Sequence, residues 1–200
     1  MDTYHHEDLR SELLEAGISL VARDGILSCS LRKVAAECKV SHGAPYSHFK
    51  NKDELLKAMQ EYITELFSES LEKALKEISG SENPLLKLGE TYFNFFVDNP
   101  NYYNFLFGHA NISLDLRNVA PSGTNYKPYE IFKNLVLSIL KTNRCAENKQ
   151  NDIVISLWAY IHGLTSLATM KNVTYDKNWK EKICDFISLY ECKELKGIGQ

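Results

Sequence analysis

The sequence predicts an all-α protein in which a three-helix helix-turn-helix domain is joined by a long helix to a larger helical domain. Apolar residues recur at spacings of three and four along most of the chain, which is typical of amphipathic helices. Prolines stand where several helices are expected to start. No stretch alternates apolar and polar residues as a strand does. We expect about nine helices, with domains at residues 1–52 and 80–200 and a linking helix at 53–79.

The composition is that of an ordinary globular chain, with 44% apolar and 24% charged residues and a net charge of −3. The charge is uneven, because residues 28–52 contain five basic residues and one acid. A basic segment on an acidic chain favours an anionic partner. The five cysteines form no CxxC pair, so neither a disulfide framework nor a zinc site is predicted. The polar, acidic N-terminus predicts no signal peptide and hence a cytoplasmic protein.

Residues 7–23 form the first predicted helix, because their apolar side chains share one face. Gly25 ends it as a left-handed C-terminal residue, after which Ile26 and Leu27 are expected to pack back on the helix. Ser28 or Ser30 is expected to cap the start of the next helix, which buries one apolar face. That face consists of Leu31, Val34, Ala35 and Cys38.

A second short helix is predicted from Ser41, its N-cap, to Phe49. It is too short to be stable alone, so Val40 and Phe49 must pack into a core. The remaining side chains are then available to another molecule. They are His42, Gly43, Ala44, Tyr46, Ser47 and His48, followed by Lys50 and Lys52.

The long linking helix begins at Asn51 or Asp53 and ends before Gly80, a length of about 38 Å at 1.5 Å per residue. Helices at residues 84–98 and 101–109 follow. They carry eight aromatic residues between positions 92 and 107. These form either a bulky core or an aromatic-lined pocket for a small apolar or aromatic molecule, and the two interpretations are compatible.

Residues 111–126 lack periodicity and are predicted to be a loop. A helix at 128–140, a polar link at 143–151, and helices at 153–170 and 178–193 complete the chain. Residues 153–170 contain no Lys, Arg, Asp or Glu. Their Ser, Thr and His residues argue against a membrane span and favour a helix buried by its own domain and by a partner chain.

The stretch SLRKVAAECKVSHGAPYSHFKNKDELL closely resembles the DNA-binding domain of TetR/AcrR-type transcriptional regulators. The family pattern V-S-x-G-x-x-Y-x-H-F-x-x-K-x-x-L is matched at every fixed position from Val40 to Leu55. Residues 4–10 and WAYIHGL at 158–164 further resemble the subgroup with a WHG-type effector domain. The subgroup more often has Gly where Glu7 stands and a longer basic residue where Ser47 stands.

The resemblance implies that the second short helix enters the DNA major groove. His42 and Gly43 would face bases, Ala44 would touch a thymine methyl, and Arg32 would read a guanine or hold a phosphate. Tyr46 and His48 would bind phosphates. The full set of implied DNA contacts is Arg32, Lys33, Ser41, His42, Gly43, Ala44, Tyr46, Ser47, His48 and Lys52.

The larger domain is expected to bind an effector and a second copy of the chain. The predicted pocket consists of Tyr92, Phe93, Phe96, Tyr103, Phe107, Trp158 and His162, although His162 is equally compatible with a core position. The predicted dimer interface, a four-helix bundle, consists of Ile153, Leu157, Tyr160, Ile161, Leu164, Leu167, Ile183, Phe186, Ile187 and Tyr190.

These expectations describe a ligand-responsive homodimer, most simply a repressor that binds a palindromic operator. The alternative is a small helical enzyme or lipid or small-molecule carrier that uses the aromatic cavity. No catalytic motif supports the enzyme, and neither a cofactor nor a metal is predicted. The adjacent His5 and His6 lack a third ligand, so solvation explains them better than a metal does.

Overall fold

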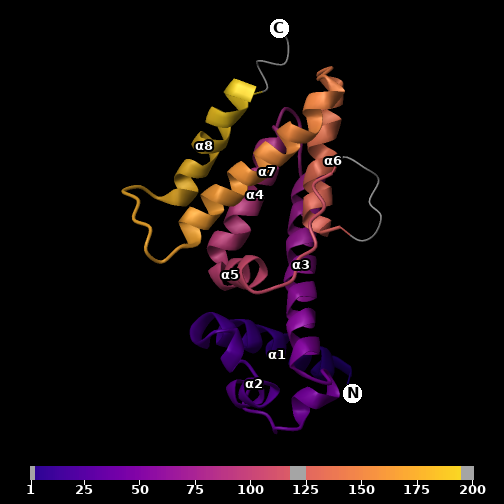
Figure 1. The fold of residues 1–200 in the computed structure, drawn as a ribbon, viewed down its shortest axis with the longest axis vertical. Coiled ribbons are helices and arrows are strands. Elements are labelled where there is room, and N and C mark those ends of the chain that lie inside the picture. The colour runs from indigo at the N-terminus through magenta and orange to yellow at the C-terminus, as the bar shows by residue number, and fades with distance from the viewer. Residues whose placement is uncertain (1–2, 118–124, 195–200) are drawn as a thin grey trace. The chain divides into compact units, whose positions relative to one another are not determined.

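The computed structural model describes residues 3–117 and 125–194, with side chains from 9 to 117 and from 125 to 189. Within these ranges it contains eight α-helices, two 3-10 helices and no strand, which confirms the all-α prediction (Figure 1). The elements are α1 (Thr3–Asp24), η1 (Ile26–Ser28), α2 (Leu31–Glu37), η2 (Ala44–Ser47), α3 (Lys52–Lys76), α4 (Pro84–Asp98), α5 (Pro100–Gly108), α6 (Lys127–Thr142), α7 (Glu147–Thr169) and α8 (Trp179–Glu194).

The chain divides into two compact units. Unit 1 comprises residues 1–65 and 100–112, and unit 2 comprises residues 66–99 and 113–200. The helix α3 runs from one unit into the other, and α5 follows α4 after the single residue Asn99. The predicted larger domain, residues 80–200, includes residues 100–112. The structure groups these residues, and with them α5, with the helix-turn-helix.

Unit 1 is held together by apolar side chains from α1, α2 and the first half of α3. Leu13, Val34, Leu55 and Met59 are all completely buried. Gly17 lets α1 approach α3 closely, because a Cβ at this position would lie 3.0 Å from the Met59 sulfur.

Unit 2 has an aromatic core built around Phe67. The Phe67 ring lies 5.1 Å from Tyr92, 5.0 Å from Phe95 and 4.6 Å from Phe96, measured between ring centroids. Such pairs contribute about 0.5–1.5 kcal/mol each beyond their buried area. Much of the aromatic run at 92–107 thus serves the core, as one of the two interpretations of the sequence proposed.

The helix ends follow local sequence signals with two exceptions. Ser30 caps α2 by accepting a hydrogen bond from the Lys33 amide at 3.3 Å, so Ser30 rather than Ser28 is the cap. Gly25 has a φ of 82°, as expected of a glycine that ends a helix. Leu27, however, is 93% exposed, so the prediction that it packs back on α1 was wrong. The other exception concerns α7, which starts at Glu147 and includes most of the predicted polar link.

Two helices end in the same left-handed motif with a basic residue in the strained position. At the end of α2, Lys39 has a φ of 55° and donates its amide to the Ala36 carbonyl. At the end of α6, Arg144 has a φ of 57° and donates to the Lys141 carbonyl. Glycine usually occupies this position, because a side chain there is strained.

None of the helices in the described ranges is long and apolar enough to span a membrane.

Candidate nucleic-acid interface and effector cavity

The segment between α2 and α3 is a 3-10 turn rather than the short α-helix that the sequence predicted. The turn η2 covers Ala44–Ser47. Pro45 explains the difference, since it has no amide hydrogen to donate to the Ser41 carbonyl. The Ala44 amide bonds that carbonyl instead, at 3.0 Å. The residue before η2 is Gly43, and no side chain caps the turn, so Ser41 does not act as its N-cap.

Buried residues anchor the turn, and most of its other side chains are exposed. Pro45 and Phe49 are buried, and the Phe49 amide bonds the Pro45 carbonyl at 2.9 Å. Tyr46 is 52% exposed. The predicted DNA-contacting side chains that are exposed are Arg32, Lys33, Ser41, His42, Gly43, Tyr46 and Ser47, and those that are half-buried are Ala44, His48 and Lys52. The turn thus presents polar groups on a surface that apolar contacts hold in place.

Arg32 and Lys33 stand exposed in the first turn of α2. Within the described ranges neither forms an ion pair. Arg23, by contrast, bonds Glu37 at 2.6 Å and Asp24 at 3.0 Å, and its hydrogen bond lowers the pKa of Asp24. The charge of Arg23 is therefore paired within unit 1, whereas the charges of Arg32 and Lys33 are available to phosphates.

Lys52 has a structural contact that the sequence did not reveal. Its ammonium donates to the Ile26 carbonyl at 2.6 Å and so ties η1 to the start of α3. Just before it, Asn51 accepts from the Glu54 amide at 2.9 Å while Glu54 accepts from the Lys50 amide at 2.7 Å. Asn51, one of the two predicted start positions, therefore caps α3.

Arg10 is a further cation beside the recognition turn. Its guanidinium carbon lies 5.6 Å from the centre of the Phe49 ring, within the range of a cation–π contact. The sequence gave no sign of this placement, because the two residues are far apart along the chain. It adds one more exposed positive group next to η2.

A polar cluster of three residues joins three helices in unit 1. Glu15 of α1 accepts a hydrogen bond from Tyr62 of α3 at 2.8 Å, and the same carboxylate oxygen accepts from Tyr102 of α5. Burial, followed by the hydrogen bond to Glu15, raises the pKa of Tyr62 to about 12. Both hydroxyls therefore stay protonated and bound at physiological pH. We call these residues the Glu15 cluster.

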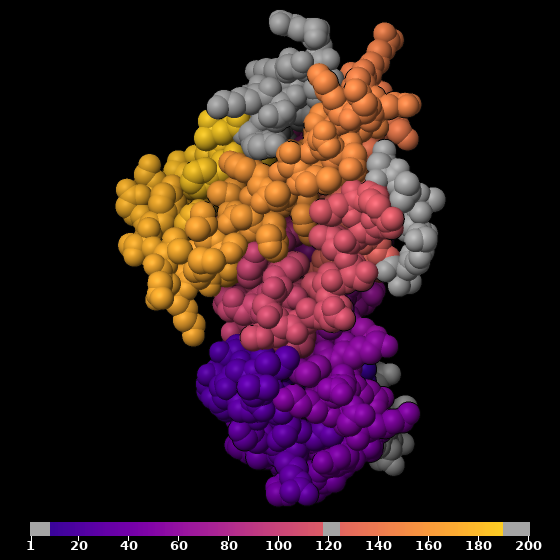
Figure 2. Space-filling view, viewed as in Figure 1, coloured from indigo at the N-terminus to yellow at the C-terminus, as the bar shows by residue number. Residues whose placement is uncertain are grey.

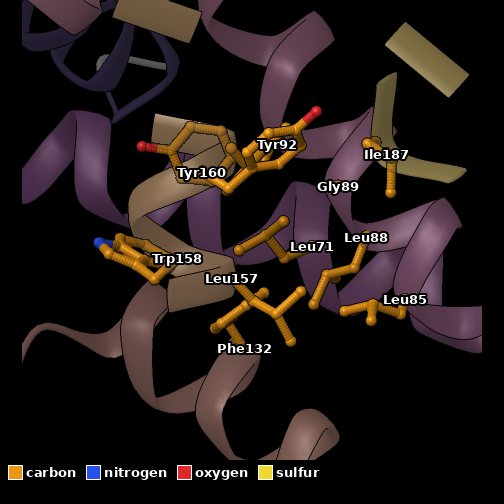
Figure 3. A pocket seen from close by; sticks show the side chains of 11 residues that line it. Leu71, Leu85, Leu88, Gly89, Tyr92, Phe132, Leu157, Trp158, Tyr160 and Ile187 are labelled. Carbon is orange, nitrogen blue, oxygen red and sulfur yellow. The ribbon is translucent and has the colours of Figure 1, made fainter. Parts of the chain in front are cut away.

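Unit 2 contains a small apolar cavity of about 20 Å³ (Figure 3). Its lining comes from the second half of α3 and from α4, α6, α7 and α8, and consists of Leu71, Leu85, Leu88, Gly89, Tyr92, Phe132, Leu157, Trp158, Tyr160, Ile161 and Ile187. Pockets for drug-sized ligands measure roughly 300–1,000 Å³. A ligand of that size would therefore have to displace lining side chains.

The predicted pocket residues are distributed over several places. Tyr92 and Trp158 line the cavity and pack edge to face at 5.2 Å. Phe93 and Phe96 are completely buried in α4 without lining it. Tyr103 and Phe107 belong to unit 1, where their rings lie 4.9 Å apart. The lining residues that the sequence missed are mainly aliphatic, and their helical spacing looked like that of ordinary core positions.

His162 is connected to the cavity through Tyr92. Its Nδ1 lies 2.9 Å from the Tyr92 hydroxyl, and burial lowers the pKa of His162. The ring is therefore neutral near pH 7, and the lining carries no charged residue. Figure 3 shows only the Tyr92 and Tyr160 hydroxyls and the Trp158 nitrogen as polar atoms among the labelled side chains.

Much of the predicted dimer interface is buried within unit 2 itself. Leu157, Ile161, Ile183 and Ile187 are at most 7% exposed, so they have no surface to offer a partner. Ile153, Leu164 and Phe186 are half-buried, as is Tyr160, whose hydroxyl donates to the Phe186 carbonyl; Leu167 is exposed, and Tyr190 lies outside the described side chains. The large apolar residues exposed on α7 and α8 are Leu167, Met170 and Leu189.

The exposed side of α7 carries small residues as well. Ser156, Ala159 and Gly163 are exposed, and a Cβ at Gly163 would meet nothing within 4 Å. Figure 2 shows α7 and α8, in orange and yellow, next to each other on one face of unit 2. The sequence could not separate this face from the buried one, because neither carries a charged residue between positions 153 and 169 of α7.

Among the described side chains there is no group of three or more His, Cys, Asp or Glu residues arranged to hold a metal. His5 and His6 lie outside those side chains.

Comparison with known proteins points to one family. Residues 13–59 match the sequence model described as bacterial regulatory proteins, tetR family. An HTH-type transcriptional regulator of Haemophilus influenzae is 32% identical over 93 residues, which cover 46% of this chain and 50% of that protein. The nicotine-responsive transcriptional repressor HdnoR of Paenarthrobacter nicotinovorans is 40% identical over 76 residues, 38% of each chain. The chain thus matches half or less of these relatives' length.

The fold extends the likeness beyond the matched segment. The crystal structure of a TetR family transcriptional regulator, PfmR from Thermus thermophilus, superposes with a TM-score of 0.64 at 15% identity, over 88% of this chain and 95% of that one. At this identity the match shows the fold: an N-terminal helix-turn-helix followed by a helical C-terminal domain.

Proposed function

We propose that this chain is a ligand-responsive, DNA-binding transcriptional regulator of the TetR type, most simply a repressor. The observation that carries the proposal is the helix-turn-helix of unit 1. Its turn η2 exposes His42, Gly43 and Tyr46 while Pro45 and Phe49 anchor it. The match of residues 13–59 to the tetR family and the names of the relatives support the same function.

The DNA contacts follow from exposure and charge. Arg32 and Lys33 carry unpaired charge near the turn, and Tyr46 and Ser47 offer hydroxyls to phosphates. Gly43 keeps the backbone free to approach base edges, since nothing lies within 4 Å of its missing side chain. Lys52 donates to the Ile26 and Leu27 carbonyls and so holds η1, which leaves one of its three protons for a phosphate.

A palindromic operator requires two copies of the chain. We place the dimer interface on the exposed face of α7 and α8, where Ala159 and Gly163 allow close helix approach and Leu167, Met170 and Leu189 supply apolar contact. The resemblance of residues 158–164 to WHG-type effector domains remains part of this proposal.

The effector would occupy unit 2 by enlarging the cavity beside Trp158, and the bound state would favour a geometry that no longer fits the operator. The helix α4 lines the cavity and continues, after Asn99, into α5, which the Glu15 cluster ties to α1. As a regulator of transcription, the protein would act in the cytoplasm. A carrier would need a larger space for its cargo than about 20 Å³, so the structure does not favour that alternative.

The test is a DNA-binding titration with the DNA that flanks the protein's own gene, at several salt concentrations. The wild type should bind tightly, and Lys33→Ala should reduce the slope of log K against log salt by about one, because one cation that neutralises a phosphate is lost. Tyr46→Ala removes an uncharged contact and should weaken binding without changing the slope. Glu61→Ala, an exposed change on α3, serves as the control. Absence of salt-dependent binding to this DNA would argue against the function.

A further inference from the structure

Within the described ranges, a buried ammonium group in unit 2 has only long contacts. Lys133, in the middle of α6, is 7% exposed. Its Nζ lies 3.7 Å from a carboxylate oxygen of Glu130 and 3.5 Å from the Arg117 carbonyl. Good charge-assisted hydrogen bonds measure about 2.7–2.9 Å. Because a buried charge is costly unless it is well paired, this arrangement calls for a further acceptor.

The neighbouring carboxylates are already engaged by other donors. Glu130 accepts a hydrogen bond from the Asn125 side chain at 2.5 Å. Asp115 is held by Arg117 through two hydrogen bonds of 2.9 and 2.7 Å, which keep the pKa of Asp115 well below its usual range. Each carboxylate therefore already has a closer donor than Lys133.

A second unsatisfied donor lies one helical turn before Lys133. Tyr129 is completely buried, and its hydroxyl has no hydrogen-bond partner within the described ranges. Residues four apart on a helix share a face. Burial and the charges of Glu130 and Asp115 raise the pKa of Tyr129, so this hydroxyl stays protonated and remains a donor.

Tyr129 adjoins the wall of the cavity. The Tyr129 ring packs edge to face on Trp158 with centroids 5.2 Å apart, and the Phe132 ring does so at 5.4 Å. Trp158 and Phe132 both line the cavity. A molecule that displaces the Trp158 side chain would therefore meet apolar surface and the Tyr129 side chain, with Lys133 one helical turn further along α6.

We propose that Lys133 and Tyr129 form the polar end of the ligand site in unit 2, and that they bind an acceptor oxygen, a carboxylate or a carbonyl, of a molecule whose apolar part lies against Trp158 and Phe132. This inference rests on the proposed function only in taking the bound molecule to be the effector. It makes the effector amphiphilic rather than purely apolar. A hydrocarbon would leave both donors unsatisfied, and sites that hydrogen-bond a ligand strongly reject analogues that lack the bonding group.

The test compares three ligands that share one apolar body: 4-ethylbenzoate, 4-ethylbenzamide and 1,4-diethylbenzene. Their affinities for the full chain are measured by calorimetry and by the shift in melting temperature at 5 mM ligand. The two oxygen-bearing ligands should bind the wild type at least tenfold more tightly than the hydrocarbon. If only the benzoate binds, the accepted group is an anion; if both bind, a neutral oxygen suffices.

The variants assign the binding to the two donors. Lys133→Met and Tyr129→Phe should each weaken binding of the oxygen-bearing ligands at least tenfold and leave the hydrocarbon unchanged. Lys127→Met, an exposed lysine on the same helix, should bind like the wild type. Equal affinity for all three ligands, unchanged affinity in Lys133→Met, or no melting shift with any ligand in the wild type would each overturn the proposal.

A DNA titration on the same samples separates this inference from the proposed function. Binding of the benzoate through Lys133 without any DNA binding would leave the site standing and remove the regulator. Salt-dependent DNA binding without a Lys133-dependent ligand effect would do the reverse.

Discussion

The two units treat their buried polar groups differently. In unit 1, one carboxylate of the Glu15 cluster receives two phenol hydroxyls and joins α1, α3 and α5. In unit 2, Lys133 and Tyr129 are more deeply buried, and their hydrogen-bonding capacity is largely unused. A satisfied polar cluster stabilises one arrangement of helices, whereas an unsatisfied one leaves free energy for a ligand to release. The difference suits the proposed function, in which unit 1 binds DNA and unit 2 responds to an effector.

The largest expected effect is the loss of the Glu15 cluster. Glu15→Ala removes the charged acceptor that the Tyr62 and Tyr102 hydroxyls share, and with it two charge-assisted hydrogen bonds, so the free energy of unfolding should fall by about 3 kcal/mol. Urea denaturation measures this loss. Glu12→Ala, an exposed change on the same helix, should alter the free energy by less than about 0.5 kcal/mol. A loss below about 1 kcal/mol for Glu15→Ala would remove the contrast between the units.

The corresponding change in unit 2 should have the opposite sign. Lys133→Met replaces a poorly paired buried ammonium with an apolar side chain of similar length, and the free energy of unfolding should rise by about 1 kcal/mol. Lys127→Met, whose lysine is exposed and pairs with Glu72 at 3.3 Å, is the matched control and should change it by less than about 0.5 kcal/mol. Destabilisation of Lys133→Met by more than about 2 kcal/mol would mean that Lys133 is well satisfied after all.

The two left-handed helix ends should respond alike, which isolates the polar clusters as the source of the contrast. Lys39→Gly and Arg144→Gly each relieve the strain of a side chain at positive φ, partly offset by the greater chain entropy of glycine. Each should raise the free energy of unfolding by roughly 0.5 kcal/mol, measured by thermal denaturation. Unequal gains would show that tertiary contacts of Lys39 or Arg144 matter more than the backbone.

The smallest expected effect is a pH dependence from His162. Burial lowers its pKa in the folded state, so below the ordinary value of about 6.5 the unfolded chain binds a proton that the folded chain refuses. Stability contributed by the neutral His162 is therefore complete above pH 6.5 and declines as the pH falls through 6 and 5. His162→Gln should show a shallower decline in melting temperature over this interval. Identical pH profiles would mean that His162 is protonated without cost in the fold.

Prediction from sequence worked best where the physics is local. The cap at Ser30 and the positive φ of Gly25 agree with the structure, because neighbouring residues decide them. The spacing of the fixed residues of the family pattern, from Val40 to Leu55, is also a local feature. Even here Pro45 was overlooked, although its missing amide hydrogen turns the predicted helix into a 3-10 turn. The structure places most of the predicted DNA-contacting side chains at the surface.

Prediction failed where several helices meet. Leu157, Ile161, Ile183 and Ile187 have the spacing of an interface, but they are buried inside unit 2. Tyr103 and Phe107 belong to a different unit from the cavity. The sequence predicted neither the Glu15 cluster nor the Lys133 and Tyr129 pair. The residues of the cluster are far apart along the chain, and no sequence pattern shows that a buried donor has few acceptors.

The sequence by itself thus determined the all-α class, most helix positions and the exposure of the segment between α2 and α3. Backbone hydrogen bonds, caps and apolar periodicity decide these features, and they act over a few residues. Only the tertiary structure decided which apolar face of α7 is buried, how small the cavity is, and which buried polar groups are satisfied. Periodicity shows that residues share a face of a helix, but what covers that face depends on side chains brought together from distant parts of the chain.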